Sequence, residues 1–268
     1  MNDITVIILT KNEEKNIEAA IISAKQIASR ILVIDSGSTD ATAEIAGSLG
    51  AEVVTHEWSG YAAQFNWALD NCKIDTEWVF RLDADERISK ELAEEIRDKL
   101  PVTSANGLSM RWRIYFMGKW IKHGGTHKPY FLRLFRYGKG REEERPMDEY
   151  IIVDGCVEKL SGDLIHYDYK GLDSWLSKHI NYSNLELETI APQTTLRVGN
   201  REQIAKRSMY YRLPLFQRAR LYYWYRYYLQ LGFLDGREGR IFLYLQSYWY
   251  RFVIDAKLYE RAISAHEK

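Results

Sequence analysis

The first hundred residues of the chain alternate between short apolar runs and longer segments with helical periodicity. Residues 4–9 form an almost continuous apolar run, as expected of a parallel strand that is covered on both faces. From Ile17 onward, apolar residues recur at positions i, i+3, i+4 and i+7, which predicts a helix over residues 16–28. The alternation continues with predicted strands at 30–34, 52–55 and 77–82 and predicted helices at 41–49, 61–71 and 89–100. Strands separated by helices of this length predict βαβ units, and therefore an α/β fold with a mostly parallel central sheet.

Beyond Leu100 the pattern changes to strand candidates without intervening helices. Residues 107–116 alternate like a strand, and shorter strand candidates follow. A helical pattern at 172–190 is expected to close this domain. A chain of 268 residues is long enough for one α/β domain and an appendage. We therefore predict an α/β domain over residues 1–190 and a helical extension over residues 191–268.

A pair of carboxylates, Asp83 and Asp85, directly follows the predicted strand at 77–82. Side chains on an extended strand alternate between faces, so we expect both carboxylates to project the same way. The carboxyl ends of the strands in an open α/β sheet face the crevice where ligands bind. Two like charges this close repel unless a cation lies beside them, and hard cations share oxygen ligands with phosphates. The pair therefore predicts a divalent metal, Mg²⁺ or Mn²⁺, that carries a diphosphate; a helix cap or a solvated turn is the alternative.

Two further polar loops, residues 10–14 and 35–40, follow predicted strands at the same edge. Three such loops can enclose a nucleotide. No Gly-x-Gly-x-x-Gly or Gly-Lys-Ser/Thr motif follows the first strand, so metal and side chains must hold the phosphates. We expect a later residue of the second loop to cap the next helix and Asp35 to point into the crevice, with a capping role for Asp35 as the alternative.

Three motifs, in this order along the chain, resemble those of inverting glycosyltransferase family 2. They are Val6-Ile7-Ile8-Leu9-Thr10-Lys11-Asn12-Glu13, Val33-Ile34-Asp35-Ser36-Gly37-Ser38-Thr39-Asp40 and Leu82-Asp83-Ala84-Asp85-Glu86. Four later segments resemble bacterial members that build the lipopolysaccharide core. They are Met147-Asp148-Glu149-Tyr150, Val153-Asp154-Gly155, Leu164-Ile165-His166-Tyr167 and Trp249-Tyr250-Arg251-Phe252. The resemblance implies the GT-A nucleotide-sugar fold and an inverting hexosyl transfer from a nucleotide-sugar donor, with UDP as the expected nucleotide.

The resemblance also implies roles for individual residues in the donor pocket. The nucleobase would lie against Asp35 and the ribose near Glu13, in a pocket that includes Thr10 and Lys11. Asp83 would contact the ribose or a metal-bound water as well as the metal. Lys11 stands where many relatives have Tyr, which weakens the case for stacking on the base.

An inverting transfer needs a carboxylate that takes the proton of the acceptor hydroxyl. The resemblance places this base at Asp148 and Glu149. Alignment on Val153-Asp154-Gly155 puts Glu149 in the base position, whereas Asp148 stands where the subgroup often has His. A pair of surface carboxylates ahead of a strand is the alternative.

Three more side chains are candidates for this site. A neutral His can ligate a metal or donate to a phosphate, so His166 is a candidate metal ligand beside Asp85, with a structural role as the alternative. Arg133 and Arg136 stand three positions apart on a predicted strand and therefore face opposite sides. One of the two is expected to reach the diphosphate.

The formal net charge is zero, but the C-terminal part is basic and aromatic. From Arg201 onward there are thirteen Lys and Arg against six Asp and Glu, and eleven of the nineteen tyrosines follow Arg207. Tyr, Trp and Arg in amphipathic helices suit the headgroup region of a bilayer, so the segments 218–228 and 242–252 predict contact with an anionic membrane surface. Packing on the rest of the chain, or in a homo-oligomer, is the alternative. No nucleic-acid module is recognisable, and we expect no nucleic-acid partner.

The composition also bears on location. The chain has no apolar run of the roughly 18 residues needed for a membrane-spanning helix and no charged-then-apolar leader. Cys72 and Cys156 have no spacing typical of metal or redox sites. We therefore expect a cytoplasmic protein, peripheral on the cytoplasmic face of the inner membrane.

Together these features predict a metal-dependent inverting glycosyltransferase that moves a hexose to a glycan or lipid-linked acceptor, such as lipopolysaccharide core. A polyprenyl-phosphate glycosyltransferase is the near alternative, because its acceptor is a phosphate and needs no base. A nucleotidyltransferase would need a glycine-rich, basic first loop, which is missing here. A membrane-associated scaffold with a degenerate sugar-nucleotide domain is the alternative outside enzymes, and the intact carboxylate pairs speak against it.

Overall fold

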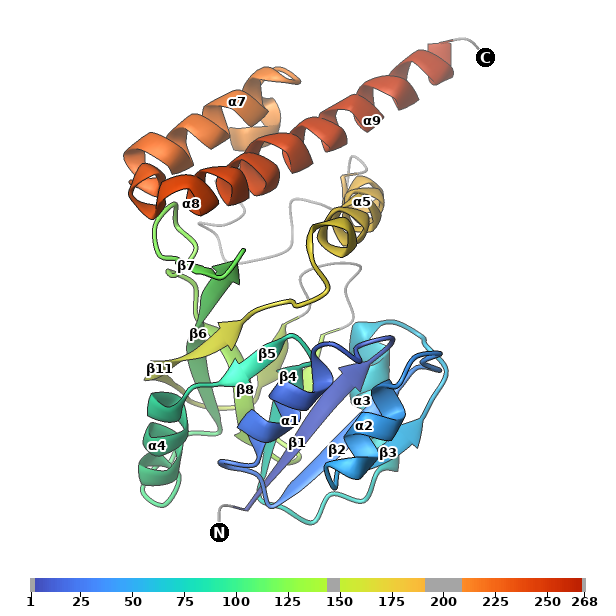
Figure 1. Cartoon of the computed structure of the whole chain (residues 1–268), viewed down its shortest axis with the longest axis vertical. Helices are drawn as coiled ribbons and strands as arrows, with labels where there is room; N and C mark the ends of the chain where they lie inside the picture. The colour runs from blue at the N-terminus through green and yellow to red at the C-terminus, as the bar shows by residue number, and fades with distance from the viewer. Residues whose placement is uncertain (1–2, 144–149, 191–208, 267–268) are drawn as a thin grey trace. The chain divides into compact units, whose positions relative to one another are not determined.

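The computed structural model describes residues 3–143, 150–190 and 209–266 of the chain. The chain divides into two compact units. The first comprises Met1–Tyr115 and Thr126–Lys170, and the second comprises Phe116–Gly125 and Gly171–Lys268. Figure 1 labels the helices and strands of both units.

The first unit is built on one sheet with a parallel half. Its strands are β1 (Ile4–Thr10), β2 (Arg30–Asp35), β3 (Glu52–Thr55), β4 (Trp78–Asp83), β5 (Glu86–Ile88), β6 (Gly107–Phe116), β8 (Phe131–Arg136) and β11 (Val157–His166). Their order in the sheet is β3-β2-β1-β4-β8-β6-β11-β5. Neighbouring strands among the first four are parallel, and so are β6 and β11. Strands β8 and β5 run antiparallel to their neighbours. The predicted α/β class and mostly parallel sheet are confirmed. A separate antiparallel pair is formed by β9 (Gly140–Glu142) and β10 (Ile151–Val153).

The helices of the first unit lie where the periodicity predicted them. They are α1 (Ile17–Ala24), α2 (Thr42–Ser48), α3 (Tyr61–Asn71) and α4 (Lys90–Lys99). Helix α4 begins at Ser89, whose Oγ accepts a hydrogen bond from the backbone N–H of Leu92 at 3.2 Å. Helix α2 is followed by Gly50, which adopts a φ of +79° that favours glycine and ends the helix.

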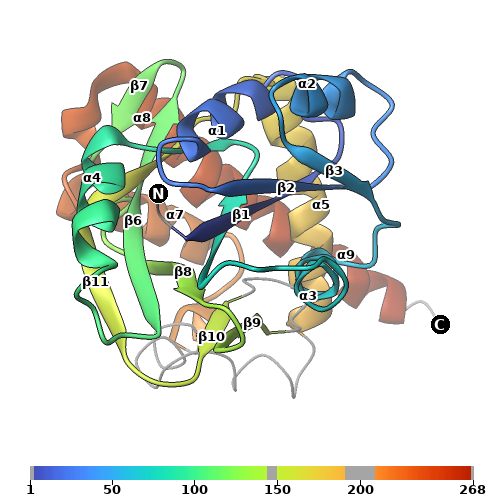
Figure 2. The same ribbon diagram turned by 90° about the horizontal axis from the view of Figure 1, so that it is seen from below.

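The apolar run of β1 is explained by burial on both of its faces. Ile4, Val6 and Ile8 are fully buried in one cluster with residues of α1, whereas Ile7 and Leu9 pack in a second cluster with residues of α3. Figure 2 shows α1 and α2 on one side of β1 and β2 and α3 on the other. Burying each such side chain contributes about 1.5–3 kcal/mol, so both layers of helices hold β1 and its polar C-terminal end in place.

In the part of the second unit that the structure describes, the elements are helices and one short strand. Its elements are β7 (Lys119–Ile121), α5 (Leu172–Thr189), α7 (Gln217–Trp224), a π-helical segment (Tyr225–Leu229), a 3₁₀ turn (Gly232–Asp235), α8 (Gly236–Leu243), a second π-helical segment (Tyr244–Trp249) and α9 (Tyr250–His266). Helix α5 packs on α9 through Leu187, Tyr250 and Ile254. We had expected α5 to close the α/β domain, but in the structure it groups with the C-terminal helices. The predicted limits of 1–190 and 191–268 stay a prediction.

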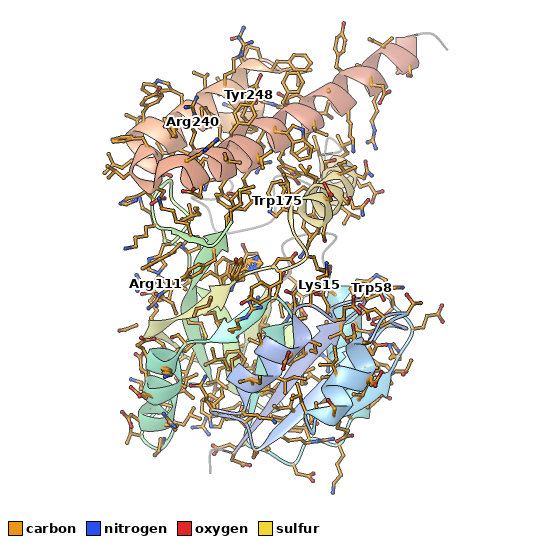
Figure 3. All side chains as sticks on the ribbon, viewed as in Figure 1. Lys15, Trp58, Arg111, Trp175, Arg240 and Tyr248 are labelled. Carbon is orange, nitrogen blue, oxygen red and sulfur yellow. The ribbon has the colours of Figure 1, made fainter. Side chains whose placement is uncertain are left out.

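Several arginines that suggested a membrane surface are buried inside the second unit. Arg218 is 3% exposed, and its Nε donates to Oδ1 of Asp255 at 2.7 Å. Arg226 is also buried, and Arg251 pairs with Glu186 at 2.5 Å. Their guanidinium groups lie over tyrosine rings of the same unit, and Figure 3 shows the side chains of these helices, among them Arg240 and Tyr248. For these three arginines the packing alternative is therefore the correct one.

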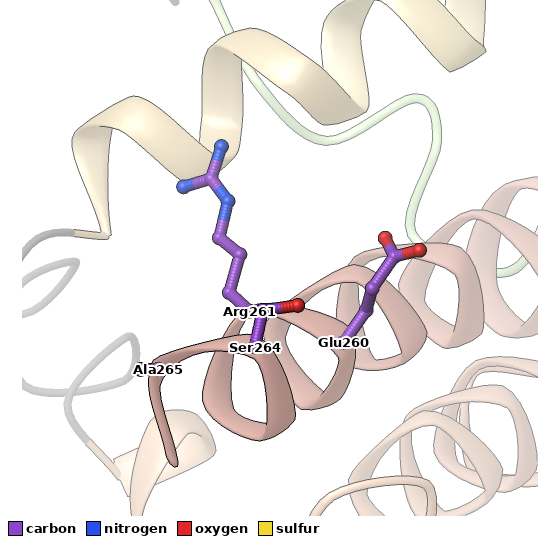
Figure 4. Close-up of a pocket in the computed structure, with 4 residues that line it drawn as sticks. All are labelled: Glu260, Arg261, Ser264 and Ala265. Atoms are coloured by element: carbon purple, nitrogen blue, oxygen red, sulfur yellow. The ribbon is translucent and has the colours of Figure 1, made fainter. Parts of the chain in front are cut away.

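Two further observations concern the surface of the second unit. Within the described ranges, no helix combines the length and the apolar character that crossing a membrane requires. A hollow beside α9 is lined by Glu260, Arg261, Ser264 and Ala265, as Figure 4 shows. All four come from one end of one helix, so the hollow does not bring together the groups that a catalytic site needs.

Candidate active site

The loops after β1 and β2 meet through a hydrogen bond between two predicted site residues. Thr10 and Asp35 are paired in register at the carboxyl ends of their strands, and Thr10 Oγ1 donates to Asp35 Oδ1 at 3.0 Å. Asn12 joins the loops again, because its N–H donates to Ser38 Oγ at 2.8 Å and its Oδ1 accepts from the N–H of Thr39 at 2.8 Å. The two loops therefore form one braced edge, on which Lys11 is exposed.

Asp35 is buried, and its carboxylate accepts hydrogen bonds from residues of its own loop. In addition to the bond from Thr10, it accepts from the N–H of Gly37 at 3.1 Å and from the N–H and Oγ of Ser38 at 2.8 and 2.5 Å. A carboxylate has about four acceptor positions, so a nucleobase would have to replace one of the two hydroxyl donors. Asp40 does bond the start of α2, through the N–H of Thr42 at 3.0 Å, as expected of a later loop residue. Both the loop role and the crevice role of Asp35 thus remain compatible with its position.

Glu13 is held by one neighbour in the sequence and by one residue far away in it. Its Oε1 accepts from Nζ of Lys170 at 2.5 Å, and its Oε2 accepts from Nδ2 of Asn16 at 2.8 Å. Asn16 is fully buried and also binds the segment after β11, with Nδ2 donating to Asp168 at 2.9 Å and Oδ1 accepting from the N–H of Tyr169 at 2.8 Å. Burial raises the pKa of the Glu13 carboxyl, although the bonds from Lys170 and Asn16 oppose this increase. Sequence reasoning missed Lys170 and the bonds from Asn16 to Asp168 and Tyr169, because no local pattern connects residues more than 150 positions apart.

The acidic motif lies in a tight turn rather than on an extended strand. Strand β4 ends at Asp83, and Asp85 lies in the turn before β5. The expectation that strand alternation aligns both carboxylates was therefore wrong. Asp83 Oδ2 accepts from Nη2 of Arg133 at 2.8 Å, and the same nitrogen donates to Oε1 of the buried Glu86 at 2.7 Å. Arg133 thus reaches the turn, whereas Arg136 points elsewhere and donates to backbone carbonyls at 3.1 and 3.2 Å.

The turn groups several carboxylates with several arginines. Burial raises the pKa of the Glu86 carboxyl to about 7, Arg133 opposes the shift, and the charges of Asp83 and Asp85 add to it. Burial acts to lower the pKa of Arg133, but the charges of Asp83, Glu86 and Glu142 raise it overall. Arg81 Nη2 also lies 3.5 Å from Asp83 Oδ1, so more than one arginine offsets the carboxylates of the turn.

Asp85 in the turn and His166 at the end of β11 form the part of the site that fits a metal. Asp85 Oδ1 lies 3.8 Å from His166 Nδ1, and this buried nitrogen has no hydrogen-bond partner among the residues that the structure describes. A carboxylate and an imidazole at this separation suit two ligands of one divalent cation, and such cations commonly complete their shell with substrate phosphates and water. No cluster of three or more His, Cys, Asp or Glu side chains that could hold a metal occurs within residues 3–143, 150–190 and 209–266. Asp83, Asp85 and His166 therefore do not form a closed three-ligand site.

Arg87 holds the turn through hydrogen bonds to backbone carbonyls. Sequence reasoning missed this residue too. Its Nη1 donates to the backbone carbonyls of Tyr167 at 2.6 Å and Asp85 at 3.2 Å. Its guanidinium lies 4.5 Å over the ring of Tyr169. Because Tyr167 directly follows His166, this one side chain ties the positions of Asp85 and His166 together. The predicted base residues Asp148 and Glu149 lie outside the described residues.

The fold and this site define a class of protein. A parallel half-sheet with polar loops after β1, β2 and β4, followed by antiparallel β8, is the GT-A type of nucleotide-sugar-binding domain. The sequence profile described as Glycosyl transferase family 2 matches residues 5–159, more than half of the chain. The chain belongs to glycosyltransferase family 2, as the three motifs predicted.

The relatives agree with this assignment. The chain is 30% identical over 275 residues to the lipopolysaccharide core biosynthesis glycosyltransferase LpsC of Rhizobium meliloti, covering 96% of this chain and 92% of LpsC. It is 40% identical over 209 residues to an uncharacterized glycosyltransferase of Rickettsia prowazekii, covering 72% and 70% of the two chains. An uncharacterized glycosyltransferase of Rickettsia bellii is 52% identical over 93 residues, a match that spans 35% of this chain and 31% of the relative's length.

Among solved structures, the chain is similar to glucosyl-3-phosphoglycerate synthase from Mycobacterium tuberculosis in complex with Mn²⁺, UDP and glucosyl-3-phosphoglycerate. The match covers 41% of this chain and 44% of that chain, at 23% identity and a TM-score of 0.36. A similarity of this extent does not bear on ligands or reaction.

Proposed function

We propose that this protein transfers a hexose from a nucleotide sugar, expected to be a UDP-sugar, to a glycan or lipid-linked acceptor with inversion. The observation that carries the proposal is the meeting of three polar loops at one sheet edge, after β1, β2 and β4, with Asp85 and His166 beside them. The similarity to LpsC over nearly the whole chain supports lipopolysaccharide core as the acceptor. A peripheral location on the cytoplasmic face of the inner membrane would suit a lipid-linked acceptor.

The described residues would divide the work as follows. A divalent cation, Mg²⁺ or Mn²⁺, offsets charge on the departing diphosphate when it is bound. Asp85 and His166 would hold it, and Asp83 would face the ribose or a metal-bound water while paired with Arg133. Thr10, Lys11, Glu13 and Asp35 would line the nucleoside pocket. Lys170 and Asn16 would act as positioning residues, because they orient Glu13 rather than contact the donor.

The reaction type is tested at the proposed base. If Glu149 takes the proton of an acceptor hydroxyl, Glu149→Gln should lower kcat by about 100-fold or more, while the affinity for the donor stays unchanged. The assay combines a panel of nucleotide sugars with a lipopolysaccharide-core acceptor. Asp148→Asn is measured beside it, and a larger loss of kcat in Asp148→Asn than in Glu149→Gln would assign the base to Asp148 instead. Full activity of Glu149→Gln with a polyprenyl phosphate as acceptor would instead favour a polyprenyl-phosphate glycosyltransferase.

The nucleotide pocket is tested by comparing two loop carboxylates. Asp35→Ala should weaken UDP binding by about 1–3 kcal/mol, because buried polar partners lose their match. Asp40→Ala is the matched control, because Asp40 bonds the start of α2 in the same loop without being a predicted donor contact. It should lower stability by about 1 kcal/mol and leave UDP affinity unchanged. Titration calorimetry measures both, and equal UDP affinities for Asp35→Ala and the parent would remove Asp35 from the pocket.

A further inference from the structure

Exposed apolar side chains are found in the second half of helix α7 and in the segment that follows it. Six of these large side chains are Leu221, Trp224, Tyr228, Leu229, Phe233 and Leu234. Each is between 44% and 61% exposed. Leu221, Trp224 and Tyr228 stand at i, i+3 and i+7, so they share one helical stripe, and the Trp224 and Tyr228 rings lie 5.9 Å apart. We call these six residues the 221–234 surface. So many large exposed apolar side chains within one short segment indicate an interaction site rather than ordinary surface.

A buried polar framework holds this surface in place. Asp235 is 3% exposed and accepts from the N–H of His123 at 2.8 Å, and its Oδ1 lies 2.7 Å from His123 Nδ1. Arg226 Nε donates to the carbonyl of Gly124 at 2.6 Å, and the N–H of Gly124 donates to the carbonyl of Gln230 at 2.9 Å. The turn that displays Phe233 and Leu234 is thus anchored on both sides by the loop 116–125 of the same unit.

The backbone of this turn is also closely fitted and strained. A Cβ on Gly232 would lie 2.2 Å from Leu243 Cδ1 and 2.9 Å from the carbonyl oxygen of Arg226. Leu231 has a φ of +59°, in the left-handed region that costs a residue with a side chain about 1–2 kcal/mol. A strained residue, Leu231, and a tightly packed one, Gly232, therefore lie beside apolar side chains that the fold leaves exposed. Backbone strain of this kind points to a function for the surface.

The exposed charges of the segment that carries this surface are mostly positive. The segment 210–252 contains seven arginines against Asp235 and Glu238. Three of the arginines are engaged inside the unit, as described above, whereas Arg212, Arg220, Arg237 and Arg240 are exposed. Asp235 is buried, and Glu238 lies 3.4 Å from Lys119. The apolar side chains are therefore accompanied by exposed cations without a matching number of exposed carboxylates.

We propose that the 221–234 surface docks on an anionic bilayer. Its aliphatic and aromatic side chains would insert at the boundary of headgroups and acyl chains, where Trp and Tyr are preferred, and the exposed arginines would contact lipid phosphates. A second copy of the chain is the weaker fit, because a two-fold interface would bring the same arginines of both copies together. The proposal deepens the peripheral location given above and does not depend on glycosyl transfer.

The test measures binding of the full chain to vesicles without donor or acceptor. The parent should sediment with vesicles that contain phosphatidylglycerol and much less with pure phosphatidylcholine, and high salt should release it in part. Phe233→Gln/Leu234→Gln should weaken binding about tenfold or more, because the inserted apolar surface is lost. Arg220→Glu/Arg237→Glu should also weaken it, and in low salt more than in high salt. The matched control is Tyr259→Gln/Ile263→Gln on α9, which changes two residues of similar exposure, 53% and 43%.

Three outcomes would overturn the proposal. In the first, the parent binds equally well to both kinds of vesicle. In the second, the Phe233/Leu234 and Tyr259/Ile263 variants lose vesicle binding equally. In the third, Phe233→Gln/Leu234→Gln changes the mass measured by light scattering but not the binding to vesicles. The third would assign the surface to a second copy instead. An unaltered melting temperature shows that each variant is folded. Vesicle binding by a protein without transferase activity would leave the docking surface standing and reject the proposed reaction.

Discussion

Asp85→Asn is expected to lower kcat/KM for glycosyl transfer by about 1,000-fold, the largest loss among the described residues. The substitution keeps the size of the side chain but removes the charge that, with the imidazole of His166, would hold a divalent cation. Donor binding by calorimetry should become insensitive to a chelator in Asp85→Asn, whereas the parent should lose most of its affinity when the chelator is added. This second measurement separates a metal ligand from a residue that acts in chemistry alone.

Two matched variants sharpen this result. Asp83→Asn should cost less activity, because its carboxylate is paired with Arg133 and would keep one acceptor oxygen for that bond. Asp70→Asn removes an exposed carboxylate that pairs with Arg141, and it should leave activity unchanged. Donor affinity that does not respond to chelator in the folded parent would rule out a metal role for Asp85 and His166.

Arg218→Glu is expected to destabilise the protein by about 3–5 kcal/mol, the largest stability effect that we predict. The guanidinium is buried against Asp255, so the variant places two carboxylates together without water. Arg220→Glu is the matched control two positions along the same helix. Arg220 is exposed, and its replacement should change the free energy of unfolding by less than about 0.5 kcal/mol. Denaturant unfolding followed by circular dichroism measures both.

The contribution of the Arg218–Asp255 ion pair to stability can be measured with Asp255→Asn and with the double variant Arg218→Met/Asp255→Leu. The single change should be costly because it leaves a buried guanidinium without its counter-ion, whereas replacing both partners should recover part of the loss. Equal stability of Arg218→Glu and Arg220→Glu would show that Arg218 is not buried in solution. The same comparison explains why membrane docking must be tested at Arg220 and Arg237: a loss of binding in Arg218→Glu would report unfolding.

The sequence alone determined the α/β class, the places of the early strands and helices and the three polar loops at strand ends. These features are local, because periodicity records which face of a segment is buried, and residues such as Gly50 and Ser89 act on their own helix ends. The motifs likewise carried the family, since their order along the chain follows the order of β1, β2 and β4. The roles of Glu149 and Asp148 as bases stay predictions.

Only the tertiary structure decided which charged side chains face the site and which are internal. Arg133 and Arg136 differ by three positions in the sequence, yet one binds Asp83 and the other caps backbone carbonyls. In the C-terminal helices, the count of arginines suggested a membrane surface. Because Arg218 is buried, the proposed docking surface is instead formed by the apolar residues at 221–234. Bonds such as Lys170 to Glu13 join residues 157 positions apart. Because such pairs form only when the packed elements bring their side chains together, no local pattern in the sequence records them.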